Sequence, residues 1–174
     1  MSPVAPPVLE TERLTFRRLS PDDAQTMLAL LNEPSFLQFI GDRNVRTLDD
    51  ARIYIVAGPM ASYERFGFGL YLTSLRSTGE PIGICGLLKR DVLPEMDVGF
   101  AFFPSYWGQG YATEAAAAAI AHARDAFAAP RIAAVVSPHN HASRHVLEKL
   151  GLQFERLVVL SDGAPEIELF SRAL

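Results

Sequence analysis

The stretch that decides the fold is Asp97-Val-Gly-Phe-Ala-Phe-Phe-Pro-Ser-Tyr-Trp-Gly-Gln-Gly-Tyr-Ala-Thr-Glu114, which continues into an alanine run ending at Ala119. In its first part large apolar residues alternate with small ones, at Val98, Phe100 and Phe102. A period of two indicates a strand, and Pro104 ends it. The alanine run has high helix propensity and predicts a helix to about Phe127. The stretch therefore predicts a strand, a glycine-containing turn and a long helix.

The turn before this helix has the features of an anion-binding site. The first N–H groups of a helix lack partners inside it, and the helix dipole adds partial positive charge there. Gly108 and Gly110 let the backbone approach a ligand closely. A dinucleotide fingerprint would need glycine at Thr113, and no Gly-Lys-Ser/Thr loop occurs in the chain. The turn is therefore predicted to bind an anion in some other way.

The same stretch resembles the acyl-CoA signature of the GCN5-related N-acetyltransferases (GNAT). In that family an Arg/Gln-x-x-Gly-x-Gly/Ala turn follows the fourth strand and holds the CoA pyrophosphate. Gly110 and Ala112 match its last two positions, and Trp107 stands where Arg or Gln is usual. The form Tyr-Trp-Gly-x-Gly-Tyr-Ala-Thr-Glu-Ala resembles the branch that acetylates ribosomal-protein N-termini (RimJ/RimL-like). The resemblance implies acetyl-CoA as co-substrate, bound by Phe100, Phe102, Trp107, Gly108, Gln109, Gly110, Tyr111, Ala112, Thr113, Asn140 and Ser143.

The order of the predicted elements also follows this family. Strands are expected near residues 11–19, 68–75, 81–88, 97–103, 131–136, 152–160 and 166–170, and helices near 24–31, 47–65, 110–127 and 140–150. The resemblance implies an α/β (α+β) GNAT fold: a mixed, mostly antiparallel sheet of about seven strands with four helices, splayed between the fourth and fifth strands. Residues 1–9 are expected to be a proline-rich arm, and residues 10–174 a single domain.

A second informative stretch is the last helix. The family pattern Asn-x-x-Ser, followed by Lys-x-Gly-Phe, matches Asn140, Ser143, Lys149 and Gly151, with Leu152 in place of the phenylalanine. The family places the asparagine against the pantetheine arm and the residue at Ser143 near the thioester sulfur. Asn140 can also be a helix N-cap, and the Ser143 hydroxyl can bond locally to backbone. Many relatives carry a tyrosine acid at the position of Leu147, so the proton donor here stays open between Ser143, another tyrosine and water.

Deprotonating an alkylammonium acceptor requires a base. Asp97 is the first candidate, because it shares a strand face with the small residues Gly99 and Ala101, which are expected to leave room for a ligand. Glu95 shares that face and is the second candidate. The alternative is a solvated carboxylate with a water relay. Glu114, in the first helical turn, is expected to complement the helix dipole.

The resemblance also implies that the first helices form one wall of the acceptor site. Phe36, Phe39 and Tyr63 are candidates for that wall, and core packing is an equally good explanation for each. No metal is expected: His141 and His145 have i, i+4 spacing, but Ala142 replaces the glutamate of a zincin helix.

Composition limits the possible partners. The chain has 174 residues and a formal net charge of −4, which gives no broad attraction to nucleic acid or to an anionic membrane. No basic-then-apolar leader or long apolar run is seen, and the single Cys85 fits a reducing compartment, so a cytoplasmic location is expected. A monomer or a homodimer is compatible with these features.

These observations lead to one expected function and one alternative. The expected function is acetyl-CoA-dependent N-acetyl transfer, directly to a primary amine of a protein N-terminus or a small molecule. A backbone N–H near Phe100 would act as the oxyanion donor. The alternative is a non-catalytic acyl-CoA-binding or sensing domain, which the absence of the tyrosine acid would allow.

Overall fold

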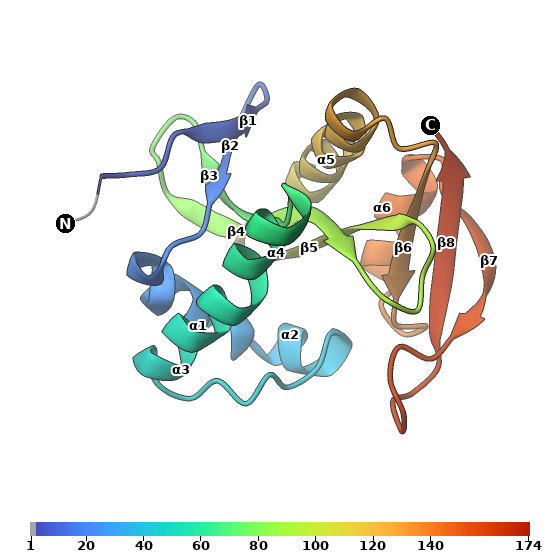
Figure 1. Cartoon of the computed structure of the whole chain (residues 1–174), viewed down its shortest axis with the longest axis horizontal. Coiled ribbons are helices and arrows are strands. Elements are labelled where there is room, and N and C mark those ends of the chain that lie inside the picture. The colour runs from blue at the N-terminus through green and yellow to red at the C-terminus, as the bar shows by residue number, and fades with distance from the viewer. Residues whose placement is uncertain (1–2) are drawn as a thin grey trace.

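One eight-stranded sheet runs through the computed structural model, which describes residues 3–174 (Figure 1). Its strands are β1 (Pro7–Glu10), β2 (Leu14–Arg18), β3 (Leu70–Leu75), β4 (Pro81–Lys89), β5 (Met96–Phe102), β6 (Arg131–Val136), β7 (Gln153–Val158) and β8 (Ile167–Ala173). Their order is β1-β2-β3-β4-β5-β6-β8-β7, and every pair is antiparallel except β5 and β6. The expected mixed, mostly antiparallel sheet is confirmed.

The sheet begins earlier than predicted. Pro7–Glu10, the end of the expected arm, pairs antiparallel with β2 as an edge strand, and Val8 and Leu9 pack against the core. A proline at the start of an edge strand removes no ladder bond that the sheet needs. The sheet therefore has one strand more than the seven expected, and the unpaired part of the arm ends before Pro7. Met1 and Ser2, also assigned to the arm, lie outside the described residues.

The helices of the described chain also outnumber the four expected. They are α1 (Ala24–Leu31), α2 (Pro34–Phe39), α3 (Leu48–Ile55), α4 (Ala61–Phe66), α5 (Tyr111–Phe127) and α6 (His141–Lys149). A single predicted helix is divided into α3 and α4 by the π-helical segment η2 (Val56–Met60), which contains Pro59. Proline has no N–H to donate, so the regular ladder is interrupted there. The expected start of this helix near residue 47 is confirmed, and a capping box forms there: Asp50 N donates to Thr47 Oγ1 at 3.1 Å.

Helices cover both faces of the sheet (Figure 1). On one face the alanine-rich side of α5 and Leu147 of α6 join the largest core cluster. On the other, α1 and α3 pack Met27, Leu30 and Ile55 against Leu72 and other residues of the sheet. Alanines let α5 lie close to the strands, which fixes the position of its N-terminus relative to β5.

The two parallel strands separate, as predicted for the fourth and fifth strands. With the additional β1 these are β5 and β6, and a single register pair, Asp97 with Ala133, joins them. Each strand is followed by a helix, α5 after β5 and α6 after β6. The N-termini of both helices therefore face the end of the sheet at which the strands have parted.

Tyr63 lies in the core and not on an acceptor wall. Its hydroxyl accepts from Leu19 N at 3.1 Å and donates to the Leu70 carbonyl, and its ring stacks on Tyr71 with centroids 5.6 Å apart. Phe36 is also buried in the core beside α1 and α3. Core packing is thus the correct interpretation for both side chains, and the Tyr63 hydroxyl ties α4 to the sheet.

Replacing Tyr63 by Phe should lower the free energy of unfolding by about 1–3 kcal/mol, because the Leu19 N–H and Leu70 carbonyl lose a buried partner. Urea unfolding followed by circular dichroism measures this change. Tyr106→Phe is the matched control, since Tyr106 is only partly buried and its hydroxyl contacts the exposed carboxylate of Glu80. Equal unfolding midpoints for the two variants would show that the Tyr63 hydroxyl does not stabilise the fold.

Candidate active site

The turn between β5 and α5 is built on two glycines with left-handed backbone. Gly108 has a φ of +73° and Gly110 a φ of +82°. Other residues adopt this conformation only at a cost, so both positions favour glycine. A Cβ added at Gly108 would meet nothing within 4 Å. The backbone at this point is therefore exposed on a side where a ligand can approach it closely.

No side chain caps the N-terminus of α5. Its N-cap residue is Gly110, which has no side chain, whereas α3 and α6 begin with hydrogen-bonded caps from Thr47 and Asn140. The first N–H that bonds back within the helix is that of Glu114, to the Gly110 carbonyl at 3.1 Å. The amides that precede it carry the partial positive charge of the helix end without a helical acceptor. This terminus is suited to an anion with several oxygens.

The side chains of the turn hold its backbone. The Trp107 indole Nε1 donates to the Phe102 carbonyl at 2.9 Å, although 49 % of the residue is exposed. The Gln109 side-chain amide donates to the Ser105 carbonyl at 3.2 Å. Trp107, in the position where the family pattern has Arg or Gln, thus ties the turn to the end of β5. These contacts indicate that Trp107 holds the shape of the turn, and its uncharged indole does not supply the positive charge of an arginine at this position.

The separation of β5 from β6 leaves backbone groups of β5 directed into the space between them. Phe103 N donates to the Ile82 carbonyl of β4 at 3.0 Å, and the β4–β5 register is continuous. In an antiparallel ladder alternate residues face the partner strand, so the Phe100 N–H points away from β4 and toward β6. Beyond Asp97 no register pair joins β6 to β5. The Phe100 amide is therefore directed where the strands have parted.

Asn140 and Ser143 meet at the start of α6. Ser143 N donates to Asn140 Oδ1 at 3.2 Å, so the N-cap role expected of Asn140 is present. Ser143 is half-buried in the first helical turn, and Leu147, one turn later, is buried in the core. The cap fixes the backbone of Ser143 after the end of β6, where α6 begins.

Asp97 is a buried carboxylate with one oxygen bonded and one free. Only 1 % of it is exposed, and Arg90 Nε donates to Oδ2 at 3.0 Å. Oδ1 has no hydrogen-bond partner among the described residues. Burial raises the pKa of Asp97 above that of an ordinary carboxyl, and the Arg90 charge acts in the opposite direction. A buried carboxylate with a raised pKa and a free oxygen has the properties of a proton acceptor.

The space expected beside Asp97 is partly filled by the protein. A Cβ at Gly99 would lie 2.8 Å from Leu88 Cδ1 and 3.6 Å from Leu70 Cδ2. Gly99 therefore makes room for these leucines, and the idea that it leaves an open space is wrong. Glu95, the second candidate, forms a longer ion pair with Arg131 at 3.7 Å and is more exposed than Asp97. Of the two carboxylates, Asp97 is the one in an unusual environment.

The part of the chain that the structure describes contains neither a metal-binding cluster nor a reactive thiol. Within it, no group of three or more His, Cys, Asp or Glu side chains could hold a metal ion. His139, His141 and His145 are all exposed. Cys85 is buried, and burial raises the pKa of its thiol, which disfavours the reactive thiolate.

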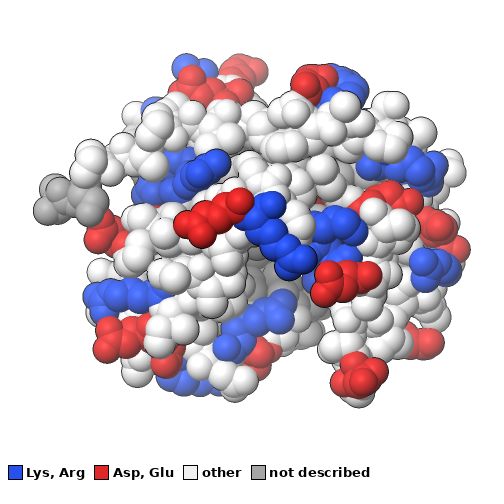
Figure 2. Space-filling model, in the orientation of Figure 1, with Lys and Arg blue, Asp and Glu red and all other residues white. Residues whose placement is uncertain are grey.

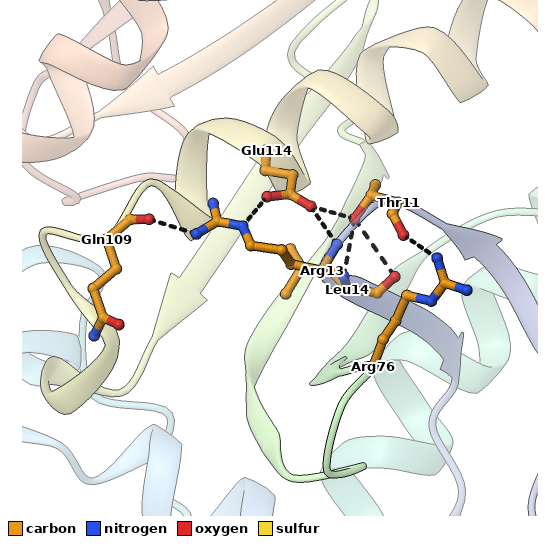
Figure 3. A network of polar contacts seen from close by, with 6 residues as sticks. All are labelled: Thr11, Arg13, Leu14, Arg76, Gln109 and Glu114. Carbon is orange, nitrogen blue, oxygen red and sulfur yellow. Dashed lines mark hydrogen bonds and ion pairs between the residues drawn. The ribbon is translucent and has the colours of Figure 1, made fainter.

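Two residues from the start of the chain complete the site, and neither was predicted to belong to it (Figure 3). Thr11 Oγ1 donates to Glu114 Oε1 at 2.6 Å, and Arg13 Nε donates to Glu114 Oε2 at 2.6 Å. Arg13 Nη1 also donates to the Gln109 carbonyl at 2.9 Å. More than ninety positions separate these partners, so periodicity and local motifs give no signal for the contact. The sequence signal for this segment is the run Glu-Thr-Glu-Arg-Leu-x-x-Arg from Glu10 to Arg17, which resembles the first strand of the RimJ/RimL-like branch.

A separate hollow of about 380 Å³ lies between α5, α6 and β8. Its lining includes Ala117, Ile120, Arg124, Lys149 and Arg172, and none of the predicted site residues. It is located beside the C-terminal end of α6, whereas the glycine turn precedes the N-terminal end of α5. The predicted site is thus a surface formed by backbone groups and does not coincide with this hollow.

The surface charge is mixed. On the face shown in Figure 2, acidic and basic side chains are interspersed and do not form a field of one sign. Within residues 3–174, no helix has both the length and the apolar character needed to cross a bilayer.

Comparison with known proteins gives a consistent result. Residues 13–153 match the family model described as an acetyltransferase (GNAT) domain. The chain is 28% identical over 163 residues to the uncharacterized N-acetyltransferase YoaA of Bacillus subtilis, covering 91% of this chain and 92% of that protein. It is similar to the crystal structure of an acetyltransferase from Agrobacterium tumefaciens, with a TM-score of 0.81, 30% identity and coverage of 97% and 95% of the two chains. RimL, a ribosomal L7/L12 alpha-N-protein acetyltransferase in complex with coenzyme A, has the same fold, with a TM-score of 0.82, 16% identity and coverage of 97% and 98%.

The carboxyl ¹³C resonance of Asp97 should titrate with a midpoint above the ordinary aspartate value of about 3.9. Arg90→Gln should move the midpoint higher still, because the charge that opposes the effect of burial is removed. Arg131→Gln is the matched control, since Arg131 contacts Glu95 and not Asp97. A wild-type midpoint at or below the ordinary value would contradict the burial of this carboxyl.

Proposed function

The chain belongs to the GNAT acetyltransferase family, and we propose that it transfers an acetyl group from acetyl-CoA directly to a primary amine. The main support from the structure is the uncapped N-terminus of α5, preceded by two glycines with positive φ. When bound, acetyl-CoA supplies an acetyl group already activated as a thioester. The protein then has to hold the diphosphate, polarise the carbonyl and accept a proton from the amine.

The diphosphate is assigned to the backbone of the turn from Trp107 to Thr113. Its oxygens can accept from the N–H groups at the start of α5, which have no acceptor in the helix. Gly108 allows this contact because no Cβ stands between the ligand and the amides, and Gly110 supplies the positive φ of the N-cap position. The substrate is thus held mainly by main-chain groups, and the side chains of Trp107 and Gln109 keep the turn in shape.

Two groups are assigned to the thioester. The Phe100 N–H, directed between the separated strands, is suited to bond the carbonyl oxygen as negative charge develops on it. The Ser143 hydroxyl, in the first turn of α6, is the proposed partner of the leaving sulfur, and Asn140 fixes its backbone. A CoA thiolate is a stable leaving group, so a water could supply the proton in place of Ser143.

Asp97 is the proposed base. Its free Oδ1 can accept a proton directly from the amine or through one water, and burial raises its pKa toward the range in which a carboxylate accepts protons effectively. Arg90, bonded to Oδ2, orients the carboxylate. Glu95 is the second candidate, at the same end of the strand but paired with Arg131.

The acceptor is proposed to reach Asp97 from the side of the sheet that α3 covers. Tyr54 of α3 lies near two cations there: burial raises the pKa of its phenol, while Arg43 and Arg90 act to lower it. Arg90 is paired with Asp97, so it is the charge of Arg43 that disfavours a polyamine here and favours a neutral or acidic acceptor, such as a peptide N-terminus or an amino acid. We also propose a cytoplasmic location, with which the free, buried Cys85 is compatible.

Incubation with acetyl-CoA should release free CoA only when an amine acceptor is present, with the acetylated amine found by mass spectrometry. A panel of an acidic peptide N-terminus, an amino acid and a polyamine tests the acceptor class, and the polyamine should react most slowly. Binding of CoA by calorimetry with no acetylated product from any amine would support the non-catalytic alternative instead.

Asp97→Asn should lower kcat by about 100- to 10,000-fold, the usual contribution of a general base, with little change in the KM for acetyl-CoA. Glu95→Gln is the matched control and should retain most of the activity. If both variants keep wild-type kcat, a water relay without either carboxylate accepts the proton.

A further inference from the structure

One side chain from the start of the chain contacts three parts of the glycine turn. Arg13 lies in the short connection between β1 and β2. Its Nη1 donates to the Gln109 carbonyl at 2.9 Å, and its guanidinium carbon lies 4.4 Å from the centroid of the Tyr111 ring. A Cβ at Gly110 would lie 3.3 Å from Arg13 Nη2. Arg13 therefore covers one side of the turn at consecutive residues, as Figure 3 shows for Gln109 and the start of α5.

The bond to Gln109 sets the direction of a peptide group. In a trans peptide the carbonyl and the N–H of the next residue point in opposite directions. Arg13 holds the Gln109 carbonyl, so the N–H of Gly110 is directed away from Arg13. The same contact withdraws a carbonyl, which would repel an anion, from the side on which the amides are exposed.

The second contact concerns the charge of Glu114. A carboxylate in the first turn of α5 interacts favourably with the helix dipole, and for the same reason it competes with an anionic ligand. Arg13 donates to it from Nε at 2.6 Å and from its backbone N at 2.9 Å, and Thr11 Oγ1 donates at 2.6 Å. Although burial acts to raise it, these bonds hold the pKa of Glu114 below its usual range. The carboxylate is thus ionised, compensated by Arg13 and oriented toward the β1–β2 connection.

We propose that Arg13 is a positioning residue for the diphosphate of acetyl-CoA. It orients the peptide between Gln109 and Gly110 and neutralises Glu114, so that the amides of the turn receive an anion without a competing negative charge. The proposal rests on the proposed function, because it assigns the diphosphate to this turn. A simple alternative is that Arg13 only fastens the β1–β2 hairpin to α5.

The test compares donors with and without a diphosphate. With acetyl-CoA, Arg13→Gln should raise the KM by about tenfold, the effect of losing a charged hydrogen-bonding group, and leave kcat within about twofold. With S-acetyl-pantetheine, which has no diphosphate, wild type and Arg13→Gln should have the same kcat/KM. Arg76→Gln is the matched control, since Arg76 Nη1 bonds the Thr11 carbonyl at 2.8 Å in the same hairpin but does not touch the turn. Arg76→Gln should leave the KM and kcat with both donors unchanged.

A double variant tests the charge compensation. Adding Glu114→Gln to Arg13→Gln removes the uncompensated carboxylate. The KM for acetyl-CoA of the double variant should therefore lie between that of Arg13→Gln and that of the wild type. A residue that only fastened the hairpin would give a double variant no better than the single one, and that result would overturn this part of the proposal.

Other outcomes overturn the proposal as a whole. These are an unchanged KM for acetyl-CoA in Arg13→Gln, or an equal loss with acetyl-CoA and S-acetyl-pantetheine. Calorimetric titration with CoA separates failure of the proposal from failure of the proposed function. If wild type binds CoA but does not turn over, the weaker binding expected of Arg13→Gln still tests the role of Arg13. If wild type neither turns over nor binds CoA, both proposals are wrong.

Discussion

Backbone amides at the start of a helix cannot all bond within it, and the rest of this site depends on that constraint. In α3 and α6 a side chain satisfies one of these amides, from Thr47 and Asn140. In α5 the capping position is occupied by Gly110, which offers nothing. The fold thus leaves the N-terminus of its longest helix without a side-chain cap while it closes those of α3 and α6. An exposed end costs little here, because water or a ligand can bond the amides.

Strands β5 and β6 separate next to this open end of α5. β5 and β6 are joined at a single pair and then diverge, so main-chain groups of β5 face the same region as the turn. The cap at Asn140 brings Ser143 to the start of the helix that follows β6. Asp97 belongs to the pair at which the two strands still touch, and its carboxylate is buried there. Two parallel strands that share one pair therefore organise the ligand-binding turn, the amide donor and the buried acid around a single point of divergence.

Local features of the sequence predicted the parts of the structure that local forces determine. The alternation from Asp97, the two glycines and the alanine run predicted β5, the turn and α5. The sheet, its splay and the family are confirmed. Assignments that depend on tertiary neighbours were less accurate. Leu88 and Leu70 fill the space above Gly99, and Tyr63 finds its partners in the core.

The structure of the N-terminal segment also depends on tertiary neighbours, and the sequence did not predict it. Pro7–Glu10 reads as an irregular proline-rich stretch and becomes a strand only because β2 offers an edge for it to pair with. Arg13 has no local feature that relates it to Gln109 or Glu114, and only the completed sheet brings them together. The roles of Asp97, Ser143 and the turn are assigned from their surroundings in the fold and stay proposals.

The connection between β1 and β2 also has a consequence for the order in which the protein folds. It leaves the ribosome long before Gln109 and Glu114, and its bonds to them span 96 and 101 positions. Contacts of such long range close slowly, because the loop between them must be ordered first. The coenzyme turn would then be among the last features to reach its final form. A bound coenzyme that stabilises this turn should in return slow hydrogen exchange in β1 and β2, at the opposite end of the chain from α6.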